Sequence, residues 1–144
     1  RERRRGYRQA LDEAGITYGK DLGYVQESNV ESGKEFTERL LTSPDPPTAI
    51  FACNDLLALG AIQAARQHGL SIPQDMSIVG FDDTVWASVS DPPLTTIAQP
   101  FQDMGIQVMN LLVQEIEGKK KHKQRIVLLP KLVIRGSTAK TPDK

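Results

Sequence analysis

Two apolar runs in this chain end abruptly in residues with side-chain oxygen atoms. The first, Ile50–Asp55, ends in an Asn-Asp pair, and the second, Ile78–Asp83, ends in two aspartates. In open parallel sheets, ligands bind at the carboxyl ends of the strands. The separation of Asn54 and Asp82 leaves room for a helix between two neighbouring strands. The sequence therefore predicts a cleft with an amide and a carboxylate on its wall.

This pair of side chains favours the binding of a hydroxylated ligand. A carboxylate accepts hydrogen bonds from neighbouring hydroxyls, while an amide both donates and accepts. Asn54 and Asp82 therefore suit a vicinal diol, such as a sugar, better than an anion. A structural interpretation competes: Asn54 and Asp55 can cap a helix, and Asp82 and Asp83 can form a turn. We favour the structural role for Asp55 and Asp83, and both roles stay open for the other two.

Catalytic or metal-binding chemistry finds little support in the sequence. Asp82 and Asp83 could ligate a metal or act in acid–base catalysis, but adjacent side chains point apart, and neither His68 nor His122 is close in the sequence. The sequence contains no nucleophile-elbow serine and no glycine-rich phosphate loop. We therefore expect a protein that is not an enzyme and that uses no metal and no cofactor.

The composition is typical of one ordinary domain. The 144 residues are 39% hydrophobic, and 18 basic residues balance 18 acidic ones. This balance gives no reason to expect nucleic acid or a membrane as a partner of this piece, and the basic stretches 1–8 and 118–125 are typical of a solvated helix face and a solvated loop. The single Cys53 excludes an internal disulfide and fits the cytoplasm. Because the chain opens without Met and already in a helical pattern, we expect it to be part of a longer protein.

Apolar strands alternate with amphipathic helices, which is typical of a parallel sheet covered on both faces and predicts an α/β fold. Pro130 divides the last two strand pieces because it cannot occupy a central ladder, and the polar tail from Gly136 is expected to fray. The predicted helices are 7–14, 31–41, 56–68 and 101–117, the last with Met104, Val108, Leu111 and Leu112 facing inward, and the predicted strands are 21–25, 49–53, 76–80, 94–98, 125–129 and 131–135.

Short motifs follow one another along nearly the whole chain. They are Arg3-x-x-Gly6-Tyr7-x-x-Ala10-Leu11, Pro47-Thr48-Ala49-Ile50-Phe51, Asn54-Asp55-x-x-Ala58-Leu59-Gly60-Ala61, Pro73-x-Asp75-x-Ser77 with the second apolar run, Pro93-Leu94-Thr95-Thr96-Ile97, Met104-Gly105, Leu129-Pro130 and Arg135-Gly136-Ser137-Thr138. In this order and at this spacing, the chain resembles the lactose-repressor (LacI/GalR) family of bacterial transcription regulators. One motif alone would be weak, but the full series is specific.

The resemblance implies a three-layer, periplasmic-binding-protein-like fold of type I, in which two similar α/β halves enclose a ligand cleft and the backbone crosses between them three times. On that basis the chain holds mostly the C-terminal half. Residues 1–93 and 131–144 would form the C-terminal subdomain of the effector-binding domain. Residues 94–130 would be crossover strands and a helix that belong to the N-terminal subdomain. The DNA-binding head is expected to be absent from the chain.

The resemblance also assigns roles to individual residues. The family's ligand triad corresponds to Arg3, Asn54 and Asp82, and Gln99 and Phe101 match positions that line the ligand pocket. Leu59 and Ile62 would suit the core as well as an interface. The candidate dimer-interface residues are Leu59, Ile62, Gln63, Trp86 and Val89.

From these features we expect the effector-binding and dimerisation portion of a cytoplasmic transcriptional repressor or activator. Its partners would be a small-molecule effector of the sugar or polyol class, a second copy in a homodimer, and operator DNA through the missing head only, with no membrane. The alternative is a periplasmic sugar-binding receptor of a transporter, which shares the architecture. The sequence upstream of Arg1 would decide between the two.

Overall fold

A four-stranded sheet organises the computed structural model, which describes residues 2–17, 19, 27–119 and 124–140. The order of the strands is β1-β2-β3-β4; the first three strands are parallel, and β4 is antiparallel to β3. This arrangement confirms the predicted α/β fold with a parallel sheet. The predicted strand 21–25 lies outside the described residues. The strands are β1 (Ala49–Phe51), β2 (Ser77–Asp82), β3 (Thr95–Ala98) and β4 (Lys131–Val133).

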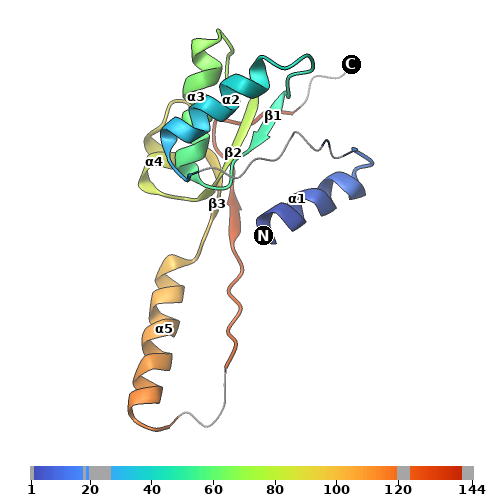
Figure 1. Ribbon diagram of the computed structural model, residues 1–144. Helices are drawn as coiled ribbons and strands as arrows, with labels where there is room; N and C mark the ends of the chain where they lie inside the picture. Colours follow the sequence, from blue (N-terminus) through green and yellow to red (C-terminus); the bar gives the residue numbers. More distant parts are fainter. Residues whose placement is uncertain (1, 18, 20–26, 120–123, 141–144) are drawn as a thin grey trace.

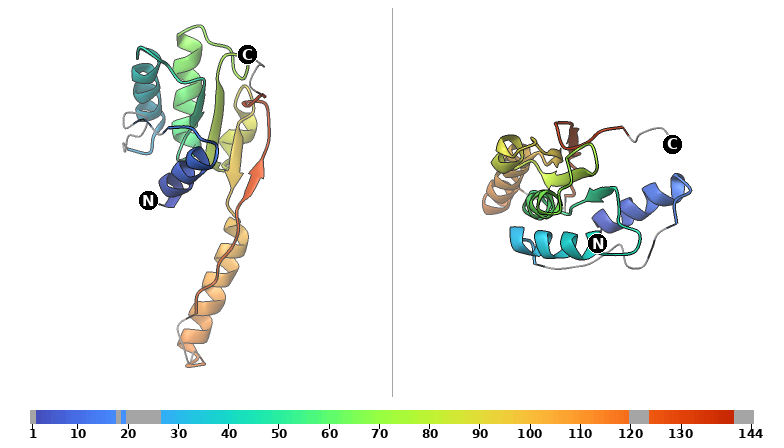
Figure 2. Two further views of the ribbon diagram at one scale, coloured as in Figure 1. Left: turned by 90° about the vertical axis from the view of Figure 1, so that its right-hand side faces the viewer. Right: turned by 90° about the horizontal axis from the view of Figure 1, so that it is seen from above.

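Helices α2 and α3 lie together beside the sheet, while α1 lies apart from them (Figures 1 and 2). Asn29 and Asn54 cap the N-termini of α2 and α3 by accepting a hydrogen bond from a backbone N–H in the first turn. Helix α4 was not expected from the sequence, because a helix of five residues is too short to show a helical period. The helices are α1 (Glu2–Glu13), α2 (Val30–Leu41), α3 (Asp55–Gln67), α4 (Val85–Val89) and α5 (Phe101–Ile116).

The core lies between α3 and the sheet. Its buried members come from α3, from β2 and the residues that adjoin the strands, and from α4, and small side chains dominate the α3 face. Alanine at these positions allows the helix backbone to approach its neighbours closely, which suits a core filled by Met76, Ile78 and Leu94 from the other side. The buried apolar residues are Ala52, Ala58, Ala61, Ile62, Ala65, Met76, Ile78, Ala87 and Leu94.

Helix α5 and the returning segment 124–130, which we call the arm, extend away from this body (Figures 1 and 2). No residue of α5 is buried, so the predicted inward face is wrong for this chain: Val108 is 62% exposed and Met104 and Leu112 are exposed as well. The spacing of the apolar residues in α5 indicates a helix face that packs against another element, but no described part of the chain packs on that face. Residues 125–129 are not a strand, because no described strand lies beside them to complete a ladder.

The segment after β4 is bonded to the sheet rather than frayed, which corrects the expectation for residues 136–140. The Ser137 hydroxyl donates to the Ile78 carbonyl at 2.6 Å and accepts from the Thr95 N–H at 2.8 Å. The Ile78 N–H donates to the Ser137 carbonyl, and the Ala139 N–H donates to the Ser77 hydroxyl. The composition of this segment is polar because its polar groups bond to two strands.

Replacing Ser137 with alanine is expected to destabilise the fold by about 1–3 kcal/mol, because a fully buried N–H and carbonyl lose their partner. Denaturant unfolding of the complete protein measures the effect. Ser71→Ala is the matched control, because Ser71 is exposed and should change stability by less than about 0.5 kcal/mol. Equal midpoints for the two variants would show that Ser137 does not contribute as described.

Candidate ligand site

The carboxyl ends of β1 and β2 lie at one edge of the sheet, which we call the carboxyl edge. Phe51 in β1 is the partner of Val79 in β2, and the strands run parallel, so the residues that follow each strand emerge on the same side. Asp82 is the partner of Ala98 at the end of β3, so Gln99, the next residue after β3, also emerges at the carboxyl edge. The register alone thus brings the ends of three strands together.

Arg3 bridges the first two strand ends. Its Nη1 donates to the carbonyl of Cys53, and its Nη2 lies 3.5 Å from Asp82 Oδ1. The guanidinium carbon also lies 3.8 Å from the centroid of the Phe81 ring, within the range of a cation–π contact. The ion pair is long and partly exposed, so its contribution to stability is small. Its effect is to orient the Asp82 carboxylate.

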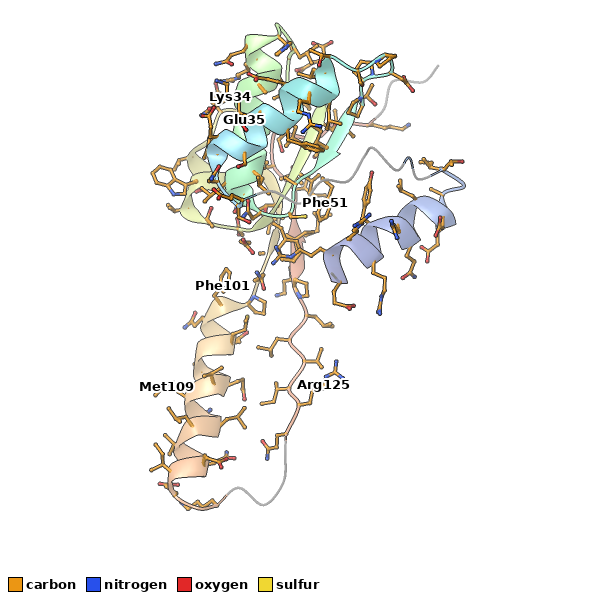
Figure 3. All side chains as sticks on the ribbon, viewed as in Figure 1. Lys34, Glu35, Phe51, Phe101, Met109 and Arg125 are labelled. Atoms are coloured by element: carbon orange, nitrogen blue, oxygen red, sulfur yellow. The ribbon has the colours of Figure 1, made fainter. Side chains whose placement is uncertain are left out.

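An aromatic pair helps to hold α1 in the position that this bridge requires. Tyr7, one helical turn after Arg3, stacks on Phe51 of β1 with ring centroids 6.2 Å apart and an interplanar angle of 15°. Figure 3 shows Phe51 at the side of the sheet that faces α1. The sequence contained the Arg-Tyr spacing, but only the structure shows which ring receives Tyr7.

Asp82 has a positive φ of 115°, which is rare for a residue with a side chain. Such a conformation costs on the order of 1–3 kcal/mol and persists where the surroundings hold it, often at ligand sites. Asp82 Oδ1 accepts a hydrogen bond from Gln99 Nε2 at 2.5 Å in addition to the contact with Arg3. Within the described part of the chain, its Oδ2 accepts no hydrogen bond. One carboxylate oxygen is therefore held in place while the other remains available.

Asn54 combines the two roles that the sequence left open. Its Oδ1 accepts from the Leu57 N–H at 2.8 Å and caps α3. Its side-chain N–H₂ has no hydrogen-bond acceptor among the residues that the structure describes. The cap fixes the orientation of the amide group, and the amide donors remain available at the half-buried end of the strand.

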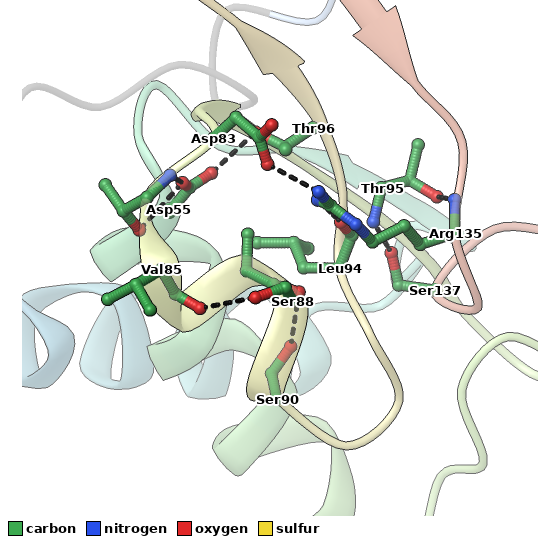
Figure 4. Close-up of polar contacts among 12 residues, drawn as sticks. Asp55, Asp83, Val85, Ser88, Ser90, Leu94, Thr95, Thr96, Arg135 and Ser137 are labelled. Atoms are coloured by element: carbon green, nitrogen blue, oxygen red, sulfur yellow. Dashed lines mark hydrogen bonds and ion pairs between the residues drawn. The ribbon is translucent and has the colours of Figure 1, made fainter.

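The other two aspartates have structural contacts, although Asp55 does not cap α3 as the sequence suggested, because Asn54 is the N-cap. Asp55 is 1% exposed; its Oδ2 accepts from the Thr84 N–H at 2.7 Å and the Thr84 hydroxyl at 3.0 Å, and its Oδ1 accepts from the Thr96 hydroxyl at 2.6 Å (Figure 4). Asp83 forms an ion pair of 2.7 Å with Arg135. Both carboxylates therefore take part in contacts within the fold, and no group of metal-binding side chains occurs among the described residues.

A hollow of about 420 Å³ lies where the chain leaves the sheet for the arm. Gln99 and Phe101 line it, and because Gln99 also bonds to Asp82, the hollow adjoins the carboxyl edge. The volume falls within the range of small-molecule sites. Arg3, Asn54 and Asp82 do not line the hollow itself. Its lining residues are Ala98, Gln99, Pro100, Phe101, Gln102, Asp103, Leu129 and Lys131.

The candidate interface residues divide into two groups. Ile62 is 4% exposed and lies in the core, so it is not accessible to a partner; the pattern on α3 could not separate a core position from a surface one. Leu59 packs half-buried against the same core. Gln63 on α3 and Trp86 and Val89 on α4 are exposed. Val85, which was not among the candidate interface residues, is exposed as well.

The geometry defines a class of protein: an α/β ligand-binding domain whose polar groups converge at the carboxyl edge of a parallel sheet. The model of the periplasmic binding protein-like domain matches residues 1–138, and the chain belongs to that family. Among the described residues, no helix is long and apolar enough to cross a membrane.

Known relatives and solved structures agree with the predicted LacI-type assignment. The chain is 48% identical over 139 residues to the HTH-type transcriptional regulator DegA of Bacillus subtilis (strain 168), covering 96% of this chain and 41% of DegA. It matches the structure of a transcriptional regulator CelR–cellobiose complex with a TM-score of 0.89 and 37% identity, over 94% of this chain and 42% of CelR. It matches the structure of the lac repressor dimer bound to operator and the anti-inducer ONPF with a TM-score of 0.82 and 33% identity. This match covers 94% of this chain and 46% of the lac repressor chain. The chain thus spans less than half the length of these regulators, none of which is named as an enzyme.

Proposed function

We propose that this chain is the effector-binding and dimerisation portion of a bacterial transcriptional regulator that binds operator DNA through a helix-turn-helix head outside these residues. The observation that carries the proposal is the Asp82 carboxylate, held at the carboxyl edge by Arg3 and Gln99 with one oxygen unpaired in the described structure. The relationship to DegA, CelR and the lac repressor supports the regulatory role. The regulator would act in the cytoplasm, without catalysis.

The effector is a hydroxylated small molecule, of which a sugar is the best fit. Asp82 Oδ2 can accept from a hydroxyl, and the amides of Asn54 and Gln99 can donate or accept. Phe101 is exposed beside the hollow and offers an apolar ring face to a ligand. The CelR complex contains cellobiose, which supports this ligand class for a similar chain.

Effector binding would act through the segments that leave the sheet. In this proposal residues 1–93 and 131–144 form one subdomain, and residues 94–130 contribute crossing segments and α5 to the other. The exposed apolar face of α5 supports this division, because such a face requires a packing partner. A ligand can shift the two halves only by the difference in its affinity for the open and closed arrangements.

Calorimetric titration of the complete protein with a sugar panel that includes cellobiose and ribose tests the ligand class. We expect one sugar to bind with one site per chain, and a set of amino acids and inorganic phosphate to give no heat. Binding of the amino acids or of phosphate alone would contradict the proposal.

A gel-shift assay separates the regulator from the transport-receptor alternative. The complete protein is expected to bind and retard operator DNA if it is a regulator, whereas a transport receptor would bind no DNA.

The second part of the proposal is a homodimer that uses the exposed apolar side chains of α4. Trp86 is 57% exposed, and Val85 and Val89 lie on the same short helix. Trp86→Glu is expected to convert the complete protein from dimer to monomer in analytical ultracentrifugation, because it places a charge in a desolvated contact. Ile16→Glu, an equally apolar and exposed position outside the patch, is the control and should leave the dimer intact. A dimeric Trp86→Glu variant would show that α4 is not at the interface.

A further inference from the structure

The turn that carries Asp82 is held from two sides. Asp82 and Asp83 are consecutive residues with positive φ, 115° and 55°, and neither is glycine. On one side, buried Asp55 binds the backbone and hydroxyl of the next residue, Thr84. On the other side, Asp83 pairs with Arg135 (Figure 4). A backbone in this conformation depends on such external contacts, because its own torsional preferences oppose it.

Arg135 contacts the turn and the strands at the same time. Its Nη2 lies 2.7 Å from Asp83 Oδ1, and its Nη1 donates to the Leu94 carbonyl, directly before β3, at 2.9 Å. Its backbone N–H donates to the Thr95 hydroxyl at 2.9 Å. Arg135 itself follows β4 by two residues. One guanidinium therefore joins the Asp82–Asp83 turn to both strands that connect the body to the arm.

The ion pair differs from a surface pair of the same chemistry. The Arg135 and Asp83 side chains are 21% and 25% exposed, whereas Arg66 and Asp91, also 2.7 Å apart, are 48% and 84% exposed. A partly desolvated pair whose donors are also used by a carbonyl holds its geometry more strictly than an exposed one. The Arg66–Asp91 pair therefore provides a matched comparison within the same body.

We infer that Arg135 is a positioning residue: through Asp83 it fixes the Asp82 carboxylate toward Gln99, and so couples the ligand site to the strands that lead to the arm. This inference rests on the proposed function, since it assigns Arg135 a role in effector binding. Arg135 does not reach Asp82 or the ligand and acts only through the turn. A lysine could keep the pair with Asp83 but has a single ammonium group, which cannot also reproduce the planar contact with the Leu94 carbonyl.

The side-chain amide of Gln99 reports the position of Asp82 without any ligand. In ¹⁵N NMR spectra of the complete protein, Arg135→Met is expected to shift the Gln99 Nε2 resonances toward those of a free amide and to speed their solvent exchange about tenfold. Arg135→Lys should give an intermediate spectrum. Arg66→Met is the control and should leave the Gln99 signals unchanged. A merely structural effect of Arg135 would lower the unfolding midpoint without moving these signals.

Titration with cellobiose completes the test. The affinity of Arg135→Met is expected to fall about tenfold relative to the parent and to Arg66→Met, with partial rescue in Arg135→Lys. Unchanged Gln99 signals in Arg135→Met would overturn the inference whether or not cellobiose binds. If cellobiose binds the parent and Asp82→Ala equally well, the assignment of the effector site fails instead. If Asp82→Ala loses binding while Arg135→Met keeps it, only the positioning role is wrong.

Discussion

Replacing Asp82 with alanine is expected to weaken the binding of the effector sugar by about 10- to 100-fold. A hydrogen bond from a sugar hydroxyl to a charged carboxylate contributes about 1.5–3 kcal/mol, and Oδ2, the oxygen without a partner in the described structure, is positioned to accept one. Gln99 also loses its acceptor, while Arg3 keeps its contacts with the Cys53 carbonyl and the Phe81 ring. Isothermal titration calorimetry at several protein concentrations measures the dissociation constant over this range.

Two further variants separate charge, shape and strain in this result. Asp82→Asn keeps the size of the side chain and tolerates positive φ, so a loss of binding in this variant reports the missing charge. Asp45→Ala removes an exposed aspartate from the loop before β1 and should bind as the parent does. If Asp82→Ala binds the sugar as tightly as Asp45→Ala, the carboxylate does not contact the ligand.

Replacing Gly60 with alanine is expected to destabilise the protein by at least about 2 kcal/mol, although alanine is favoured over glycine within a helix by about 1 kcal/mol. A Cβ at Gly60 would lie 2.0 Å from the Val30 carbonyl oxygen and 2.6 Å from the Lys34 nitrogen. Both are backbone atoms of α2, so no side-chain rotation can relieve the overlap. The helices α2 and α3 would have to separate, and the midpoint of urea denaturation measures the cost.

Gly6→Ala is the control for this prediction. Gly6 lies in α1, and a Cβ there would meet nothing within 4 Å. The variant should therefore leave stability unchanged or raise it slightly through helix propensity. If both glycine variants changed the midpoint in the same direction and to the same extent, the close approach of α2 and α3 would not be the cause.

The sequence predicted the elements that carry the candidate site better than the contacts within it. The apolar runs identified β1 and β2, and the Asn54-Asp55 pair marked the start of α3, of which Asn54 is the N-cap. Those signals are local, because period and capping depend on neighbouring residues. The predicted strand 125–129 and the predicted inward face of α5 were wrong for the opposite reason: a strand ladder and a packed helix face each need a partner that is distant in the sequence.

The contacts of Asp82, Asp83 and Arg135 show a second limit. Nothing in the sequence distinguishes an Asp-Asp pair in an ordinary turn from one with two positive φ angles, because contacts from distant segments hold these angles. Arg135 belongs to a closing motif in the sequence, which does not show that its guanidinium contacts both Asp83 and the Leu94 carbonyl. Such long-range pairing depends on the strand order, which local patterns do not specify. Similarly, the spacing of apolar residues in α3 did not show that Ile62 is buried in the core while its neighbour Gln63 is exposed and accessible to a partner.

A crystal structure of the complete protein with its tightest sugar will show which side chains hold the ligand. We expect Asp82 Oδ2 to accept a hydrogen bond from a sugar hydroxyl, with Asn54 and Gln99 contacting the same ring and Arg3 still beside Asp82. A sugar bound away from the carboxyl edge, or an Asp82 carboxylate turned away from the sugar, would show that Asp82 does not bind the effector.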